Sequence, residues 1–103
     1  MTTEERKLEA FLAEAHQRCI MAGWHPTIFD RMKNRYGTVP AITKLMESGT
    51  IQTGLDRCVE LGLADWSLEK AVIKHPSLFT AATVKCAEWR LKMAKATERG
   101  RRR

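Results

Sequence analysis

Residues 2–23, TTEERKLEAFLAEAHQRCIMAG, carry the signals of an amphipathic helix with two defined ends. Thr2 and Glu5 have the spacing of a capping box, in which each side chain accepts a hydrogen bond from the other residue's backbone N–H. Gly23 suits the left-handed position that ends many helices. Between these ends, apolar residues recur every three or four positions, at Leu8, Phe11, Leu12, Ala15, Cys19 and Ala22. The sequence therefore predicts a first helix that ends at Gly23.

Short apolar stripes between glycines, prolines and capping residues continue through the rest of the chain. Further helices are expected over residues 26–36, 38–48, 55–61, 67–75 and 80–97. Thr38 and Thr80 are expected to cap two of them, and Tyr36 is expected to face inward with Phe29 and Met32. No segment alternates as a strand would, and no hairpin dipeptide occurs. The prediction is an all-α fold, a compact bundle of five to six short helices with a longer basic C-terminal helix.

The surplus positive charge lies at the C-terminal end of the chain. The formal net charge is +6, yet residues 1–84 contain as many acidic as basic residues. The basic residues beyond them are Lys85, Arg90, Lys92, Lys95, Arg99, Arg101, Arg102 and Arg103, against Glu88 and Glu98. We expect one helical domain over residues 1–97 and a basic, flexible tail over residues 98–103.

A weaker basic stretch lies between Arg31 and Met46 and contains no acidic residue. The two regions could form one surface or two, and the sequence leaves both open. Lysine and arginine neutralise phosphates without reading base sequence, which favours a nucleic acid as partner; a solvated tail that only aids solubility is the competing interpretation. The candidate contact residues are Arg31, Lys33, Arg35, Arg90, Lys92, Lys95, Arg99, Arg101, Arg102 and Arg103.

The alternative function is a protein-interaction module, an adaptor or small inhibitor that docks on an acidic partner. Three Trp and five Met residues provide candidate anchors, since tryptophan dominates interface hot spots. Trp89 is the best of these, because it lies off the inward seam that Val84, Ala87 and Leu91 form on the last helix.

No set of catalytic residues emerges from the sequence. Asp65, Ser67 and Glu69 lie close together, but at the start of a helix such residues normally cap free backbone N–H groups. The stretch 49–54 lacks the Lys-Ser/Thr pair and the preceding strand of a phosphate-binding loop. We therefore expect no enzymatic activity, no cofactor and no small-molecule substrate.

The cysteines and histidines do not have the spacing of a structural zinc site. His16 and Cys19 can share a helix face, and Cys58 and Cys86 could complete four ligands, but such sites usually arrive as two close pairs. Three scattered cysteines favour reduced thiols in the core. The other two histidines lie beside prolines and are expected to be turn or capping residues. The sequence predicts no metal site.

No apolar run approaches the roughly 18 residues that a membrane span requires. The first seven residues, MTTEERK, are polar and resemble no secretory leader. We therefore expect a cytoplasmic protein without membrane contact.

A set of spaced residues between positions 23 and 91 forms a further sequence pattern. Its members are Gly23, Pro26, Phe29, Met32, Tyr36-Gly37, Ala41, Leu45, Gly54, Leu61-Gly62, Asp65, Ser67, Glu69, Val72, Leu78-Phe79, Ala87 and Arg90-Leu91. On these residues the chain resembles an uncharacterised bacterial all-helical domain, free-standing or attached to restriction and mobile-element proteins. It departs from that pattern at Leu63, where a basic residue is commoner, and in a shortened stretch before Phe79. The resemblance implies a helical fold and a bacterial or phage setting, and no activity.

Overall fold

The computed structural model describes residues 1–48 and 53–101, and no strand occurs among them. The elements in chain order are α1 (Thr3–Met21), α2 (Thr27–Tyr36), α3 (Thr38–Glu47), α4 (Thr53–Glu60), the short 3-10 helix η1 (Ala64–Trp66), α5 (Leu68–Lys74), a second 3-10 helix η2 (Pro76–Leu78) and α6 (Ala81–Arg101). The predicted all-α bundle with a longer C-terminal helix is confirmed. No helix in these two described ranges combines the length and apolarity needed to cross a membrane.

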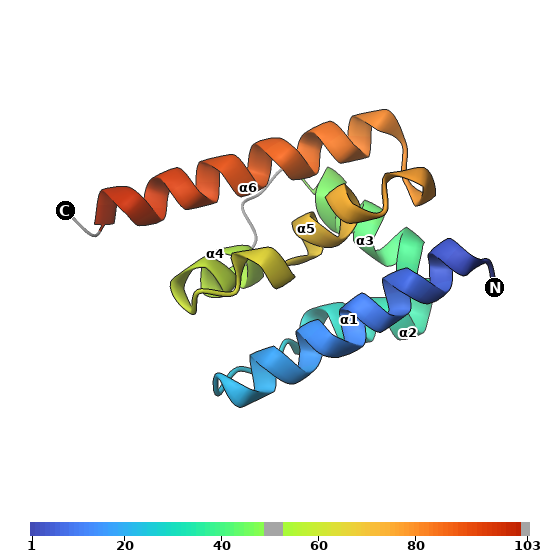
Figure 1. The fold of residues 1–103 in the computed structure, drawn as a ribbon, viewed down its shortest axis with the longest axis horizontal. Helices are drawn as coiled ribbons and strands as arrows, with labels where there is room; N and C mark the ends of the chain where they lie inside the picture. Colours follow the sequence, from blue (N-terminus) through green and yellow to red (C-terminus); the bar gives the residue numbers. More distant parts are fainter. Residues whose placement is uncertain (49–52, 102–103) are drawn as a thin grey trace.

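The helices lie in three tiers (Figure 1). α6 runs along one edge of the molecule, and α1 and α2 lie at the opposite edge. α3 and α5 fill the space between them, where α5 packs against α6 and α1, and α3 packs against α2 and α6. α4 packs against α6. α6 therefore lies along one side of α3, α4 and α5.

Two apolar clusters hold the tiers together. The larger joins α1, α3, α5 and α6 through Leu8, Leu12, Ile42, Leu45, Met46, Ala71, Val72 and Ala87. The smaller joins α4 to α6 through Leu55, Val59, Leu91 and Ala94. The predicted inward seam of the last helix is thus confirmed, because Ala87, Leu91 and Ala94 are buried.

The predicted helix ends are largely those observed. Thr2 and Glu5 form the reciprocal capping box, with N–O distances of 3.0 and 3.1 Å. Gly23 ends α1 with a left-handed φ of 86°. Ser67 and Thr80 accept hydrogen bonds from backbone N–H groups three residues on. These ends depend on neighbouring residues alone, which is why the sequence reveals them.

Two expectations near the start of α3 are wrong. Thr38 does not cap the helix, because Gly37 holds that position with a φ of 91° and the Thr38 hydroxyl donates to the carboxylate of Glu9 on α1. Tyr36 does not face inward: it is 41% exposed, with the Lys44 ammonium 4.8 Å from its ring centroid. Neither partner could be inferred from the local sequence pattern.

The last helix is longer than predicted. α6 continues past Thr97 to Arg101, so residues 98–101, expected in a flexible tail, are helical. Gly100 does not end the helix. The stretch 49–54, which could be a loop or a short extended segment from its sequence, lies outside the described residues up to position 52, and its last two residues begin α4. Arg102 and Arg103 also lie outside the described residues.

Candidate functional site

The exposed face of α6 carries a row of basic side chains. Lys85, Lys92 and Arg99 are exposed and stand seven residues apart, which is almost two helical turns, so they project from nearly the same side. At a rise of 1.5 Å per residue the row is about 21 Å long. Lys95, half-buried, lies beside it, three residues after Lys92 and four before Arg99. We call these four residues the α6 basic row.

No carboxylate in the described part of the chain forms an ion pair with the α6 basic row. Among the carboxylates that pair with cationic side chains elsewhere in the described part of the chain are Glu4, Glu9, Glu14, Glu60 and Glu69. Glu88 lies between Lys85 and Lys92, and Glu98 precedes Arg99 on the same helix, so the four cations of the row outnumber the nearby carboxylates by two. A row of cations that keeps a net positive charge and forms no ion pair attracts an external anion.

Trp89 projects from α6 beside the basic row. It is 59% exposed and lies four residues after Lys85 and three before Lys92, so all three share one region of the helix surface. Met93, 42% exposed, follows one turn later. The expectation that Trp89 lies off the inward seam is confirmed. Its contact with a partner stays a prediction.

The basic residues of α2 belong to a different surface. α2 lies at the edge of the molecule opposite α6, so the two basic regions do not merge (Figure 1). Lys33 is paired with Glu9 of α1 at 3.0 Å, and the Arg35 guanidinium lies 5.3 Å from the Tyr36 ring centroid. Arg31 is exposed. The two basic regions therefore form two surfaces, an alternative that the sequence left open. Arg31, Lys33 and Arg35 do not belong to the α6 basic row.

Arg90, predicted to contact a partner, is instead buried in the core. It is 6% exposed, and its Nε donates to Glu69 Oε2 at 3.1 Å. Glu69, predicted to cap α5, is also buried; burial raises the pKa of its carboxyl, whereas hydrogen bonds from its own backbone and from Arg90 lower it. The signal was present, because Arg90 stands three residues after Ala87 and four before Ala94, on the inward face.

Lys85 was missed as a candidate contact. Lys85 belongs to the row because it is seven residues from Lys92, which is seven residues from Arg99. The sequence contains this spacing, but it becomes informative only when the exposed face of the helix is known. The Arg101 side chain and residues 102–103 lie outside the described part of the structure, so those three candidates stay predictions.

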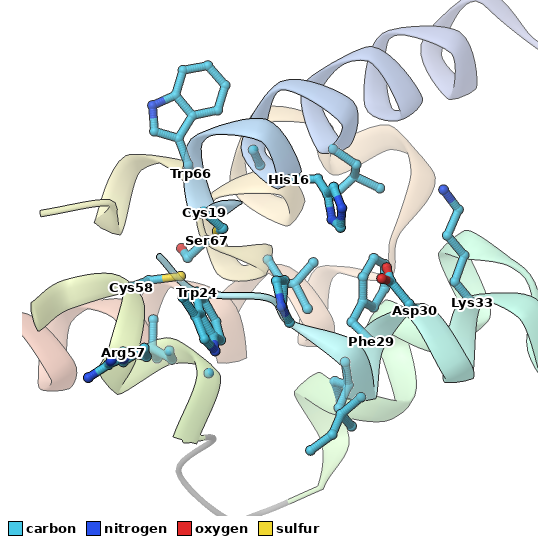
Figure 2. A pocket seen from close by; sticks show the side chains of 18 of the residues that line it. His16, Cys19, Trp24, Phe29, Asp30, Lys33, Arg57, Cys58, Trp66 and Ser67 are labelled. Carbon is cyan, nitrogen blue, oxygen red and sulfur yellow. The ribbon is translucent and has the colours of Figure 1, made fainter. Parts of the chain in front are cut away.

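A cavity of about 1020 Å³ opens between α1, the α1–α2 connection, α2 and α4, away from the exposed face of α6. Trp24, Trp66, Cys19 and Cys58 are among the residues that line it (Figure 2). Burial raises the pKa of Cys58 to about 12 and also raises the pKa of Cys19, so both thiols stay protonated at neutral pH. Both cysteines are free and buried, as predicted for core thiols, whereas Cys86 is only half-buried.

Cys86 takes no part in that cavity. Its thiol donates to the Met46 carbonyl at 3.0 Å, on the α3 side of α6. The four residues considered as zinc ligands, His16 with the three cysteines, therefore form no ligand group in the described part of the chain.

No family model, curated protein or solved structure is significantly similar to this chain. The resemblance to a bacterial helical domain stays a prediction.

Proposed function

We propose that this chain is a non-enzymatic nucleic-acid-binding domain that holds the phosphate backbone against the exposed face of α6. The observation that carries the proposal is the α6 basic row: cationic side chains aligned over about 21 Å of helix and without a described carboxylate partner. Such a row can release counterions from a polyanion, which supplies affinity without base reading.

The neighbouring Trp89 extends this proposal to unpaired bases. An exposed tryptophan beside phosphate-binding cations offers a stacking platform, and stacking tolerates any base because every base has a π face. The exposed helix would also fit the major groove of a duplex, which is about 12 Å wide. The resemblance of residues 23–91 adds a bacterial or phage setting, and the free cysteines Cys19, Cys58 and Cys86 suit a reducing compartment such as the cytoplasm.

The test is direct binding of fluorescently labelled mixed-sequence DNA, duplex and single-stranded, and of single-stranded RNA, followed by anisotropy. The row variant replaces Lys85, Lys92 and Arg99 with glutamine. The matched control replaces Arg6, Lys7 and Arg18 of α1, which removes the same charge from exposed positions across the molecule. We expect the row variant to bind at least about tenfold more weakly and the control to bind nearly as wild type.

One observation favours a second candidate, an acidic protein surface as the partner. Trp89 and Met93 are both exposed next to the basic row, and exposed aromatic and methionine side chains are typical interface anchors. Poly-glutamate serves as the probe for this alternative. Displacement of bound DNA by poly-glutamate at equal charge concentration would favour a protein partner, whereas displacement by unlabelled DNA alone supports the nucleic acid.

A further inference from the structure

Three metal-ligating side chains converge at the cavity beside α1. They are His16 of α1, His25 of the α1–α2 connection and Asp30 of α2. One potential ligand atom from each lies within 4.8 Å of the other two, and the two imidazole rings meet edge to face with centroids 5.3 Å apart. Within the described residues no other group of histidine, cysteine and carboxylate side chains is as close.

The local fold brings these residues together. Gly23, with its left-handed φ, turns the chain sharply at the end of α1, and the Trp24 N–H bonds back to the Cys19 carbonyl. The connection therefore returns along α1, which places His25 beside the His16 ring. α2 begins at Thr27, so Asp30 stands in its first turn. In Figure 2 the His16 ring and the Asp30 carboxylate lie near each other, and both residues line the cavity.

We propose that His16, His25 and Asp30 form a binding site for a divalent transition-metal ion, best suited to Zn²⁺. Two imidazoles and one carboxylate are the three protein ligands of many open zinc sites. Imidazole nitrogen favours zinc and its neighbours over Mg²⁺ and Ca²⁺, which prefer oxygen. This inference is independent of the α6 basic row, and it replaces the expectation that the chain holds no metal.

The geometry needs only a small adjustment to accept the ion. Tetrahedral coordination with metal–ligand distances near 2.0–2.1 Å places ligand atoms about 3.3 Å apart. His25 is exposed and lies between helices, so rotation of its side chain can close the remaining gap. His16 and Asp30 are half-buried and provide the fixed part of the site.

The surrounding charges are compatible with a cation. Lys33 lines the same cavity, but its ammonium is 3.0 Å from the Glu9 carboxylate, which compensates its charge. All three ligands line the cavity, so the fourth coordination position opens toward it. The ion would join α1 to the start of α2, and α2 has no fully buried residue of its own.

The test is a titration of the chelator-treated, full-length protein with Zn²⁺ by isothermal titration calorimetry, with Mg²⁺ as the oxygen-preferring control. We expect one Zn²⁺ per chain and no heat from Mg²⁺. His16→Gln, His25→Gln and Asp30→Asn should each weaken Zn²⁺ binding by at least about tenfold. Asp65→Asn, which removes an exposed carboxylate elsewhere, should leave it unchanged.

Three results would overturn the proposal. They are no Zn²⁺ binding by the wild-type protein, undiminished binding by the three ligand variants, and a thiolate-to-metal charge-transfer band after substitution with Co²⁺. That band would assign the ion to Cys19 and Cys58 instead. None of these results bears on nucleic-acid binding by α6.

Discussion

Trp89 and Arg90 are adjacent in sequence, but one lies in solvent and the other in the core. Trp89 is 59% exposed and Arg90 is 6% exposed. Successive residues of a helix point in directions about 100° apart, so one step along α6 crosses from the outer face to the inner face. The count of basic residues in the last nineteen positions therefore overstates the charge that α6 presents to solvent.

At the scale of single residues, Trp89→Ala should weaken DNA binding and leave the stability of the fold nearly unchanged. An exposed side chain contributes little to folding, so the free energy of unfolding should change by less than about 1 kcal/mol. The affinity for single-stranded DNA should fall by about 1–3 kcal/mol through the loss of base stacking. Urea denaturation and anisotropy measure the two quantities. A stability loss of about 3 kcal/mol or more would instead place Trp89 in the core.

Arg90→Ala should give the opposite pattern. It leaves the buried Glu69 carboxylate without its partner, which costs about 3–5 kcal/mol of folding free energy. Replacing both residues, Arg90→Met with Glu69→Leu, should restore most of this stability because no buried charge remains. Thermal or urea denaturation checks both variants. A stably folded Arg90→Ala protein that no longer binds DNA would contradict the structural role.

At the scale of elements, two glycine-to-alanine substitutions should have opposite signs. Gly37, between α2 and α3, has φ 91° and ψ 165°, a conformation that only glycine adopts readily, so Gly37→Ala should destabilise the protein by about 1–3 kcal/mol. Gly100 is the second-to-last residue of α6 and has open space where the methyl group of alanine would lie, so Gly100→Ala should stabilise the helix by less than about 1 kcal/mol. Urea denaturation measures both.

The Gly100 result also tests the length of α6. If residues 98–101 were an unstructured tail, as the sequence suggested, Gly100→Ala would change neither the helical circular dichroism nor the stability. A gain in both supports the helix that the structure shows as far as Arg101.

The sequence predicts what neighbouring residues determine and misses what distant residues determine. The Ser67 cap could be predicted, because the Ser67 hydroxyl accepts a hydrogen bond from the backbone N–H of Lys70, only three residues away. The pair of Glu69 with Arg90 joins residues 21 apart, and the bond from His75 to Glu4 joins residues 71 apart. Helical periodicity gives the face on which such a residue lies, but it does not give the partner.

The same limit applies to the candidate sites. The position of the surplus positive charge could be predicted from the sequence. The sequence does not show that α3 and α5 pack between α2 and α6 and keep the two basic regions apart. The cluster of His16, His25 and Asp30 depends on the reversal of the chain at Gly23. The sequence predicted that turn without showing what it brings together.

At the scale of the whole molecule, stability should fall at alkaline pH. Burial holds the pKa of Cys58 at about 12, against 9.0 for an exposed thiol. Between these values the unfolded chain has lost a proton that the folded chain keeps, so each rise in pH favours unfolding. Urea denaturation at pH 8 and pH 10 should show this loss. Cys58→Ala should show a smaller loss; an equal loss in the variant would contradict the assignment.

The most direct test of the α6 surface is the salt dependence of DNA binding. Each phosphate contact contributes close to one unit to the slope of log affinity against log salt concentration. The protein with Lys85, Lys92 and Arg99 replaced by glutamine should therefore show a slope about 2–3 units shallower than wild type, while the Arg6, Lys7 and Arg18 control keeps the wild-type slope. Equal slopes for the row variant and the wild type would show that α6 does not contact the phosphates.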